Sequence, residues 1–162
     1  MAKEEYTIRP ARAEDAQAVT AMWAEMGAEH QQYDPQRWAF AADAGEKQRE
    51  HFLRTLADQQ NGLALTATDS AGQVVGYLMA GVTEPAPVFR TKRRGQIWDL
   101  FVRPAHRGKG VGRRLMEAAV DGLKARGAED LLLRVSADNE AAIEFYRKLG
   151  LRLVAHEMYT KL

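Results

Sequence analysis

A glycine-rich run between an apolar strand and an amphipathic helix is the feature of this sequence that most restricts its fold. The run is Arg107-Gly108-Lys109-Gly110-Val111-Gly112, after a β-favouring stretch at 96–102 and before a helix predicted over about 112–126. Glycines let the backbone bend tightly because they have no Cβ. The first amides of a helix lack intrahelical partners and lie at the positive end of its dipole. The turn therefore predicts a site for a diphosphate, with mobile positive charge from its basic side chains and from Arg113.

Other glycine-rich turns fit less well. No Gly-x-x-x-x-Gly-Lys-Ser/Thr occurs, which excludes a P-loop. A dinucleotide-binding fold would have this turn early, with several βα units after it, but only about fifty residues follow Gly112. A flexible connection with solvated basic side chains would have the same local sequence. The rest of the chain must therefore distinguish it from a phosphate-binding turn.

The remaining pattern indicates one domain, residues 1–162, of mixed strands and helices. The chain has 162 residues, 46% hydrophobic and 28% charged, which suits one core. Short apolar runs predict strands, and apolar positions at helical spacing predict helices. The expected strands are 6–9, 63–68, 74–82, 96–102, 131–135 and one within 151–162; the expected helices are 16–27, 46–58, 112–126 and 139–149. The turn at 69–72 predicts an antiparallel hairpin, and prolines make 84–95 a mobile loop that we leave outside the site.

Composition limits the partners. The 23 basic and 22 acidic residues nearly balance, so nothing favours nucleic acid or an anionic membrane as the main partner. The sequence has no cysteine, which excludes disulfides and thiolate chemistry, and its four histidines have no metal-ligand spacing, so no metal is expected. Glu4 and Glu5 stand where a signal peptide would be apolar, and no stretch reaches the roughly 18 apolar residues of a membrane span. We expect a soluble, cytoplasmic protein.

Residues 97–116 resemble the central motif of the GNAT acetyltransferase superfamily, in which Arg/Gln-x-x-Gly-x-Gly/Ala opens a helix over the pyrophosphate of coenzyme A. Arg107, Gly110 and Gly112 occupy the defining positions. The resemblance runs from Ile8-Arg9-Pro10-Ala11 to a second motif at 136–151. It implies acetyl-CoA as cofactor and the GNAT fold: an α/β (α+β) domain with a central, mostly antiparallel mixed sheet of about six to seven strands and helices on both faces.

Asn139 and Tyr146 form a second ligand-facing pair. They are seven residues apart, nearly two helical turns, so their side chains leave one face about 10 Å apart. The alternative is that Asn139 caps the helix and Tyr146 packs in the core. The resemblance implies that Asn139 contacts pantetheine and that the Tyr146 hydroxyl lies near the sulfur and protonates the leaving thiolate. The implied coenzyme site comprises Leu100, Phe101, Val102, Arg107, Gly108, Lys109, Gly110, Val111, Gly112, Arg113, Asn139 and Tyr146.

A base is also required, because a protonated amine has no lone pair with which to attack. Asp99 is the first candidate, since it is an acid within an otherwise apolar strand; a structural acid paired with backbone or arginine is the alternative. A polar and aromatic cluster is expected to bind the acceptor amine, although its members also suit a solvated surface: Glu25, His30, Tyr33, Asp34 and Trp38. Arg134 stands where some N-terminal protein acetyltransferases of the superfamily have an acid, which disfavours that branch.

These observations together predict an N-acetyltransferase that moves an acetyl group from acetyl-CoA to a primary amine, small molecule or peptide, by direct attack on the thioester. A non-catalytic acyl-CoA-binding or sensing module is the main alternative, and Tyr146 with Asp99 argue against it. An enzyme of the dinucleotide-binding type is a third. Exposed strand edges are compatible with a homodimer. The sequence does not name the amine, the length of the acyl group or the oligomeric state.

Overall fold

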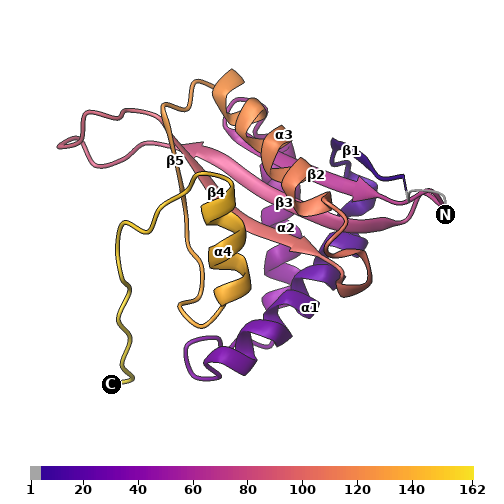
Figure 1. The fold of residues 1–162 in the computed structure, drawn as a ribbon, viewed down its shortest axis with the longest axis horizontal. Helices are drawn as coiled ribbons and strands as arrows, with labels where there is room; N and C mark the ends of the chain where they lie inside the picture. Colours follow the sequence, from indigo (N-terminus) through magenta and orange to yellow (C-terminus); the bar gives the residue numbers. More distant parts are fainter. Residues whose placement is uncertain (1–4) are drawn as a thin grey trace.

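The protein is described by a computed structural model that covers residues 5–162. One twisted sheet runs through this part of the chain (Figure 1). Its five strands lie in chain order: β1 Thr7–Pro10, β2 Gly62–Thr68, β3 Val74–Thr83, β4 Arg94–Val102 and β5 Asp130–Leu133. The first four pair antiparallel, and β5 pairs parallel with β4. The predicted mostly antiparallel mixed sheet is therefore confirmed.

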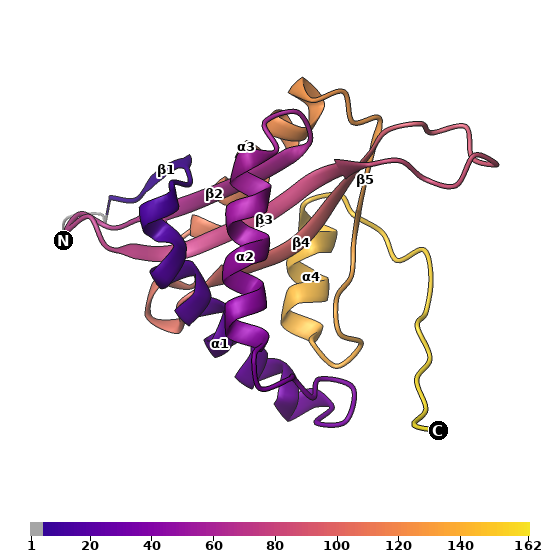
Figure 2. The same cartoon turned by 180° about the vertical axis from the view of Figure 1, so that it is seen from behind.

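Helices cover both faces of the sheet. Figures 1 and 2 show α1 Ala16–Tyr33 and α2 Ala44–Ala57 on one face, and α3 Val111–Ala125 with α4 Glu140–Lys148 on the other. Because successive side chains of a strand point to opposite faces, β3 supplies both cores. Its Tyr77 and Met79 pack with α1 and α2, whereas its Leu78 and Ala80 pack with α3. The central strand is thus buried on both sides.

The helix after the glycine-rich turn follows its apolar periodicity. Val111, Leu115, Ala119 and Leu123 recur every four residues and are almost fully buried against the sheet. Such a stripe gives most of a helix's stability through packing, because an isolated helix of this length is marginal in water. The packing fixes the start of α3 against the end of β4, which is where the phosphate site was predicted.

The expected last strand and the count of six to seven strands are wrong for the described residues. After α4, the backbone amide of Leu151 bonds to the carbonyl of Tyr146, and no residue from 152 to 162 belongs to a strand or makes a backbone hydrogen bond with another described residue. The segment has β-favouring residues, but a strand also needs a neighbouring edge within reach. Residues 1–4, including Glu4 of the signal-peptide argument, lie outside the described part.

Candidate active site

An irregularity in β4 brings two successive side chains to the same face of the sheet. Met79 of β3 is opposite Asp99, but Ala80 is opposite Ile97, so Trp98 is an extra residue and forms a β-bulge. Both Trp98 and Asp99 then point to α2: the Trp98 ring lies 5.1 Å from that of His51, and Asp99 bonds to Gln48. Bulges re-aim side chains in this way. The arrangement places an acid beside an exposed aromatic ring.

Asp99 is partly buried and has polar neighbours on α2 and β3. Gln48 Nε2 donates a 2.8 Å hydrogen bond to Asp99 Oδ2. Burial raises the pKa of Asp99 to about 6, and the contacts with Gln48 and Tyr77 and the nearby charge of His30 partly oppose this rise. Burial raises the pKa of the Tyr77 hydroxyl, and the neighbouring charge of Asp99 raises it further; this hydroxyl makes no hydrogen bond with another described residue. Asp99 can thus be ionised at neutral pH and still accept a proton.

The glycine-rich turn has the backbone conformation that a phosphate site requires. Gly108 and Gly110 have φ values of +74° and +82°, in the left-handed region that disfavours other residues. Gly110 precedes α3, and the amide of Arg114 bonds to its carbonyl, so the amides of 111–113 have no intrahelical acceptor. A Cβ on Gly108 or Gly110 would meet no atom within 4 Å, so their surroundings are open. Free amides and open space fit a diphosphate.

Gly112 differs from the expectation that three glycines form the bend. The helix begins at Val111, so Gly112 is already helical and has no positive φ. A Cβ there would come within 3.5 Å of the Phe145 ring, an ordinary van der Waals distance. Two glycines suffice for the bend because the chain enters the helix immediately after Gly110.

Arg107, expected to add positive charge to the turn, makes three contacts in the structure. Its Nε donates to the Val102 carbonyl at 2.7 Å, its Nη2 contacts Glu29 of α1 at 2.7 Å, and its guanidinium lies 5.2 Å from the centre of the Phe101 ring. Arg107 therefore joins the end of β4 to the turn and to α1. Arg113 pairs with Glu117 at 2.8 Å on the exposed side of α3.

The end of β4 separates from β5 next to this turn. Their pairing stops at Ile97 opposite Leu133, so Leu100, Phe101 and Val102 have β3 as their only strand neighbour among the described residues. Backbone groups on the β5 side of β4 are consequently available for a ligand, apart from the Val102 carbonyl that Arg107 occupies. The separation lies between the turn and α4, as Figure 1 shows.

Asn139 and Tyr146 were predicted either to face a ligand or to cap the helix and pack in the core. Asn139 caps α4, where its Oδ1 accepts a 3.1 Å bond from the amide of Ala142. Tyr146 packs against the core, with its ring 5.2 Å from that of Phe145, and burial raises its pKa to about 12. Its hydroxyl makes no hydrogen bond with another described residue. Capping and packing are thus both present, and they leave the Tyr146 hydroxyl able to donate to a ligand.

The structure brings together three of the five residues predicted to bind the acceptor. The His30 ring lies 4.5 Å from that of Trp38 and 6.0 Å from that of Tyr33. Asp34 has a local role, since its Oδ1 accepts from the amides of 36 and 37 at 3.0 Å. Glu25 pairs with Arg103 at 3.2 Å, outside this aromatic group.

Sequence reasoning missed Gln48 and His51. They lie three residues apart on α2 and therefore on one helical face, next to the buried Phe52. Two polar residues beside an inward-facing aromatic are a usable signal, but their partners Asp99 and Trp98 lie on a strand about fifty residues away. Only the packing of α2 on the bulge brings the four side chains together.

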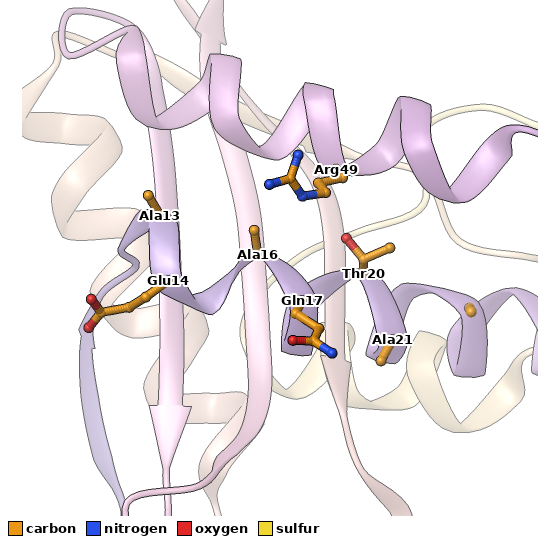
Figure 3. A pocket seen from close by; sticks show the side chains of 8 residues that line it. Ala13, Glu14, Ala16, Gln17, Thr20, Ala21 and Arg49 are labelled. Carbon is orange, nitrogen blue, oxygen red and sulfur yellow. The ribbon is translucent and has the colours of Figure 1, made fainter.

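A hollow at the start of α1 does not belong to this site. Small and polar side chains line it (Figure 3): Ala13, Glu14, Ala16, Gln17, Thr20, Ala21, Ala24 and Arg49. A smaller depression over α4 is lined by Glu140, Ile143, Glu144 and Arg147. Neither contains a predicted catalytic or coenzyme-binding residue. Among residues 5–162, no group of three side chains could hold a metal ion, and no helix has the length and apolarity to cross a bilayer.

The chain belongs to the acetyltransferase (GNAT) family, whose model matches residues 19–151. Over 83 residues it is 39% identical to a mycothiol acetyltransferase of Amycolatopsis mediterranei, a match that covers 51% of this chain and 28% of that protein. Over 60 residues it is 42% identical to N-alpha-acetyltransferase 30 of Schizosaccharomyces pombe, covering 37% and 40%. The chain thus spans less than half the length of either relative.

Solved structures have the same fold. A mutant Bacillus halodurans protein superposes with a TM-score of 0.83, at 23% identity, over 96% of this chain and 99% of that one. At this identity the likeness shows the fold alone. It agrees with the arrangement of sheet and helices described above.

Proposed function

We propose that this protein is an N-acetyltransferase that transfers the acetyl group of acetyl-CoA to a primary amine by direct attack on the thioester. The observation that carries the proposal is Asp99, an acid re-aimed by the β4 bulge, with a pKa of about 6. Family membership supports the reaction class. We further propose that residues 1–162 act as one acetyltransferase domain, and that the reaction takes place in the cytoplasm, for which the absence of cysteine is supporting evidence.

The donor side of the proposed site lies between the glycine-rich turn and α4. The amides at the start of α3 would hold the diphosphate, with Gly108, Lys109 and Gly110 leaving the backbone accessible and Arg113 adding charge. The unpaired backbone of 100–102 and the side chain of Asn139 would contact the pantetheine arm. Acetyl-CoA would supply an acetyl group activated as a thioester.

Asp99 would remove the proton that blocks the amine. An alkylammonium with a pKa near 10 is almost fully protonated at neutral pH. An Asp99 carboxylate with a pKa of about 6 is mainly ionised there, so it can accept one proton from the ammonium, directly or through water, before the freed amine attacks the thioester carbon. The second proton would leave the nitrogen after the N–C bond forms and pass through water to the departing thiolate as the C–S bond breaks. Gln48 holds Asp99 Oδ2, which fixes the direction of the carboxylate.

Tyr146 would meet the charge that develops on the leaving sulfur. With a pKa of about 12, its phenol stays protonated at neutral pH, and a thiolate with a reference pKa near 8.5 is too weak a base to take the proton outright. We therefore sharpen the role of Tyr146 from proton donation to hydrogen-bond donation.

The acceptor would be a small or peptide amine bound beside the aromatic rings. Trp38 and Trp98 offer ring faces, and an ammonium over such a face is stabilised by about 0.5–1 kcal/mol at exposed sites; His30 lies against Trp38. Tyr33 adjoins this group. Asp34 stabilises the turn that follows α1, and Glu25 pairs with the side chain of Arg103, so we do not place either carboxylate against the acceptor.

A thiol-release assay with acetyl-CoA and a panel of amino acids, polyamines, aminoglycosides and peptides tests the proposal, together with calorimetric measurement of coenzyme A binding. Turnover with at least one amine is expected, and it should be lost in Asp99→Asn. Coenzyme binding without turnover on any amine would favour the sensing module. Affinity for nicotinamide coenzymes without affinity for coenzyme A would overturn the donor site.

A further inference from the structure

The carboxylate of Glu157 lies between two arginines that come from distant parts of the chain. Arg37 Nη2 contacts Glu157 Oε1 at 3.0 Å, and Arg134 Nε contacts Glu157 Oε2 at 3.4 Å. Each arginine thus meets a different oxygen of the same carboxylate. The hydrogen bond from Arg37 and the charge of Arg134 lower the pKa of Glu157. Arg37 and Arg134 therefore form a carboxylate clamp, and Glu157 occupies it.

The clamp has more positive charge than its occupant neutralises. Two guanidinium groups face one carboxylate, and neither makes an ion pair with any other described residue. Glu157 is also replaceable, because its side chain is 55% exposed and residues 152–162 make no backbone hydrogen bond with the rest of the described chain. Figures 1 and 2 show this segment running apart from the sheet and its helices. Another carboxylate can therefore take the place of Glu157.

The clamp adjoins the aromatic group beside Asp99. The Arg37 guanidinium lies 5.0 Å from the centre of the Trp38 ring, and that ring lies 4.5 Å from the ring of His30. The charge of His30 in turn acts on Asp99. Arg134 directly follows β5, near the point where this strand separates from β4. The clamp is thus reached from the side of the molecule where the acceptor is proposed to bind.

We propose that the acceptor is a primary amine that also has a carboxylate, and that Arg37 and Arg134 bind this carboxylate in place of Glu157. The inference rests on the proposed acetyl transfer, because it assigns the other end of the same acceptor. Guanidinium groups suit this role, since their planar donors match the two oxygens of a carboxylate. In the free protein Glu157 is an internal competitor for the clamp.

The two ends of the site restrict the length of the acceptor. Its amine has to reach Asp99 while its carboxylate reaches Arg37, and the contacts that connect these residues run through the rings of His30 and Trp38. An α-amino acid has both charged groups on one carbon, which is too short for this path. We therefore expect an extended acceptor, either a free ω-amino carboxylate or a short peptide with a free carboxylate.

Matched pairs of acceptors test the need for a carboxylate. One pair is aminohexanoate and its uncharged amide, aminohexanamide; the other is a tripeptide with a free or an amidated C-terminus. We expect kcat/KM to be higher for the carboxylate by about fivefold or more in at least one pair, and added salt should reduce this preference. The pair that shows it identifies the source of the carboxylate. Turnover with equal kcat/KM within both pairs would overturn the proposal.

Variants distinguish the clamp from an ion pair with a structural role only. Arg37→Gln and Arg134→Gln should each lower the preference for the carboxylate by about two- to fivefold, through KM. Glu157→Gln should raise it, because the internal competitor is removed. Arg152→Gln, which removes an exposed cation from the same segment, is the control and should leave the preference unchanged. A structural ion pair predicts that Glu157→Gln lowers the preference or has no effect, and either result would contradict the clamp.

Nuclear magnetic resonance follows the clamp without turnover. The side-chain Nε–H signals of Arg37 and Arg134 should shift when aminohexanoate is added, and the same shifts should need a lower concentration in Glu157→Gln. Aminohexanamide should shift them less. Signals that respond equally to both compounds, or to neither, would overturn the clamp even if acetyl transfer is confirmed. Selective shifts without turnover on any amine would support the clamp and contradict the proposed acetyl transfer.

Discussion

Gln48 of α2 donates a 2.8 Å hydrogen bond to Asp99 of β4, although the two residues are 51 positions apart in the sequence. The bond orients the carboxylate and contributes to its pKa. Burial raises the pKa of Asp99, and the Gln48 bond lowers it, because an N–H donor stabilises the ionised form. The resulting pKa of about 6 lets one group be ionised at neutral pH and still act as a base.

We expect Gln48→Leu to move the acid limb of the pH profile of kcat/KM to higher pH. In the native protein this limb should have its midpoint near 6, with activity rising as Asp99 ionises. Without the donor, the carboxylate loses a stabilising bond and its pKa rises. Gln59→Leu, at an exposed position, is the control and should leave the profile unchanged. An unshifted limb in Gln48→Leu would show that another group sets it.

Asp99→Asn should remove activity and increase stability at neutral pH. Loss of a general base typically costs about 10²–10⁴-fold in rate. Because the folded pKa of Asp99 is raised, the folded protein binds more protons than the unfolded chain between about 3.8 and 6, so this group makes the protein less stable as pH rises through that window. Asparagine cannot ionise and avoids this cost.

Two measurements check the Asp99 prediction: kcat/KM, and urea unfolding at pH 5 and pH 8. The difference in unfolding free energy in favour of Asp99→Asn should be larger at pH 8. Asp121→Asn, at an exposed position on α3, should change neither quantity. A variant that is inactive because it is unfolded at both pH values would argue for a structural acid instead.

Tyr146→Phe should lower kcat by about tenfold or more while the dissociation constant of coenzyme A changes little. The hydroxyl has no hydrogen bond with another described residue, so its removal leaves no native partner unsatisfied, and the ring keeps its packing beside Phe145. Single-turnover kinetics separates the chemical step from binding. Tyr159→Phe, at an exposed position after α4, is the matched control and should leave kcat unchanged. Equal kcat in Tyr146→Phe and the native protein would exclude the proposed donor.

Replacing Gly110 or Gly112 by alanine should change the free energy of unfolding by different amounts. Gly110→Ala places a side chain at φ +82°, which is expected to destabilise the fold by about 1–2 kcal/mol. Position 112 is helical, and an alanine Cβ there would lie 3.5 Å from the Phe145 ring, an ordinary contact. Because alanine favours helices more than glycine does, the free energy of unfolding of Gly112→Ala should stay equal or rise by up to about 1 kcal/mol. Urea unfolding measures both. A larger loss in Gly112→Ala would mean that α3 and α4 approach more tightly than the structure shows.

Local rules account for what was predictable from sequence. The stripe from Val111 to Leu123 predicts α3, the 69–72 turn predicts the β2–β3 hairpin, and the glycines at 108 and 110 mark positive φ, because periodicity and backbone sterics act over a few neighbouring residues. The family resemblance of the turn and of the 136–151 motif is likewise a property of the chain itself and is confirmed.

Tertiary structure alone determined which side chains surround Asp99 and whether residues 152–162 form a strand. The bulge at Trp98, the bond from Gln48 and the fixed position of Arg107 depend on contacts between elements far apart in the chain. The β-favouring residues of 152–162 predict a strand, but pairing depends on whether an edge is within reach, which composition cannot specify. The sequence by itself determined the helices, the first five strands, the turn and the family; packing determined which side chains meet and whether the last segment pairs, because hydrogen bonds, burial and pKa depend on distance in space and not along the chain.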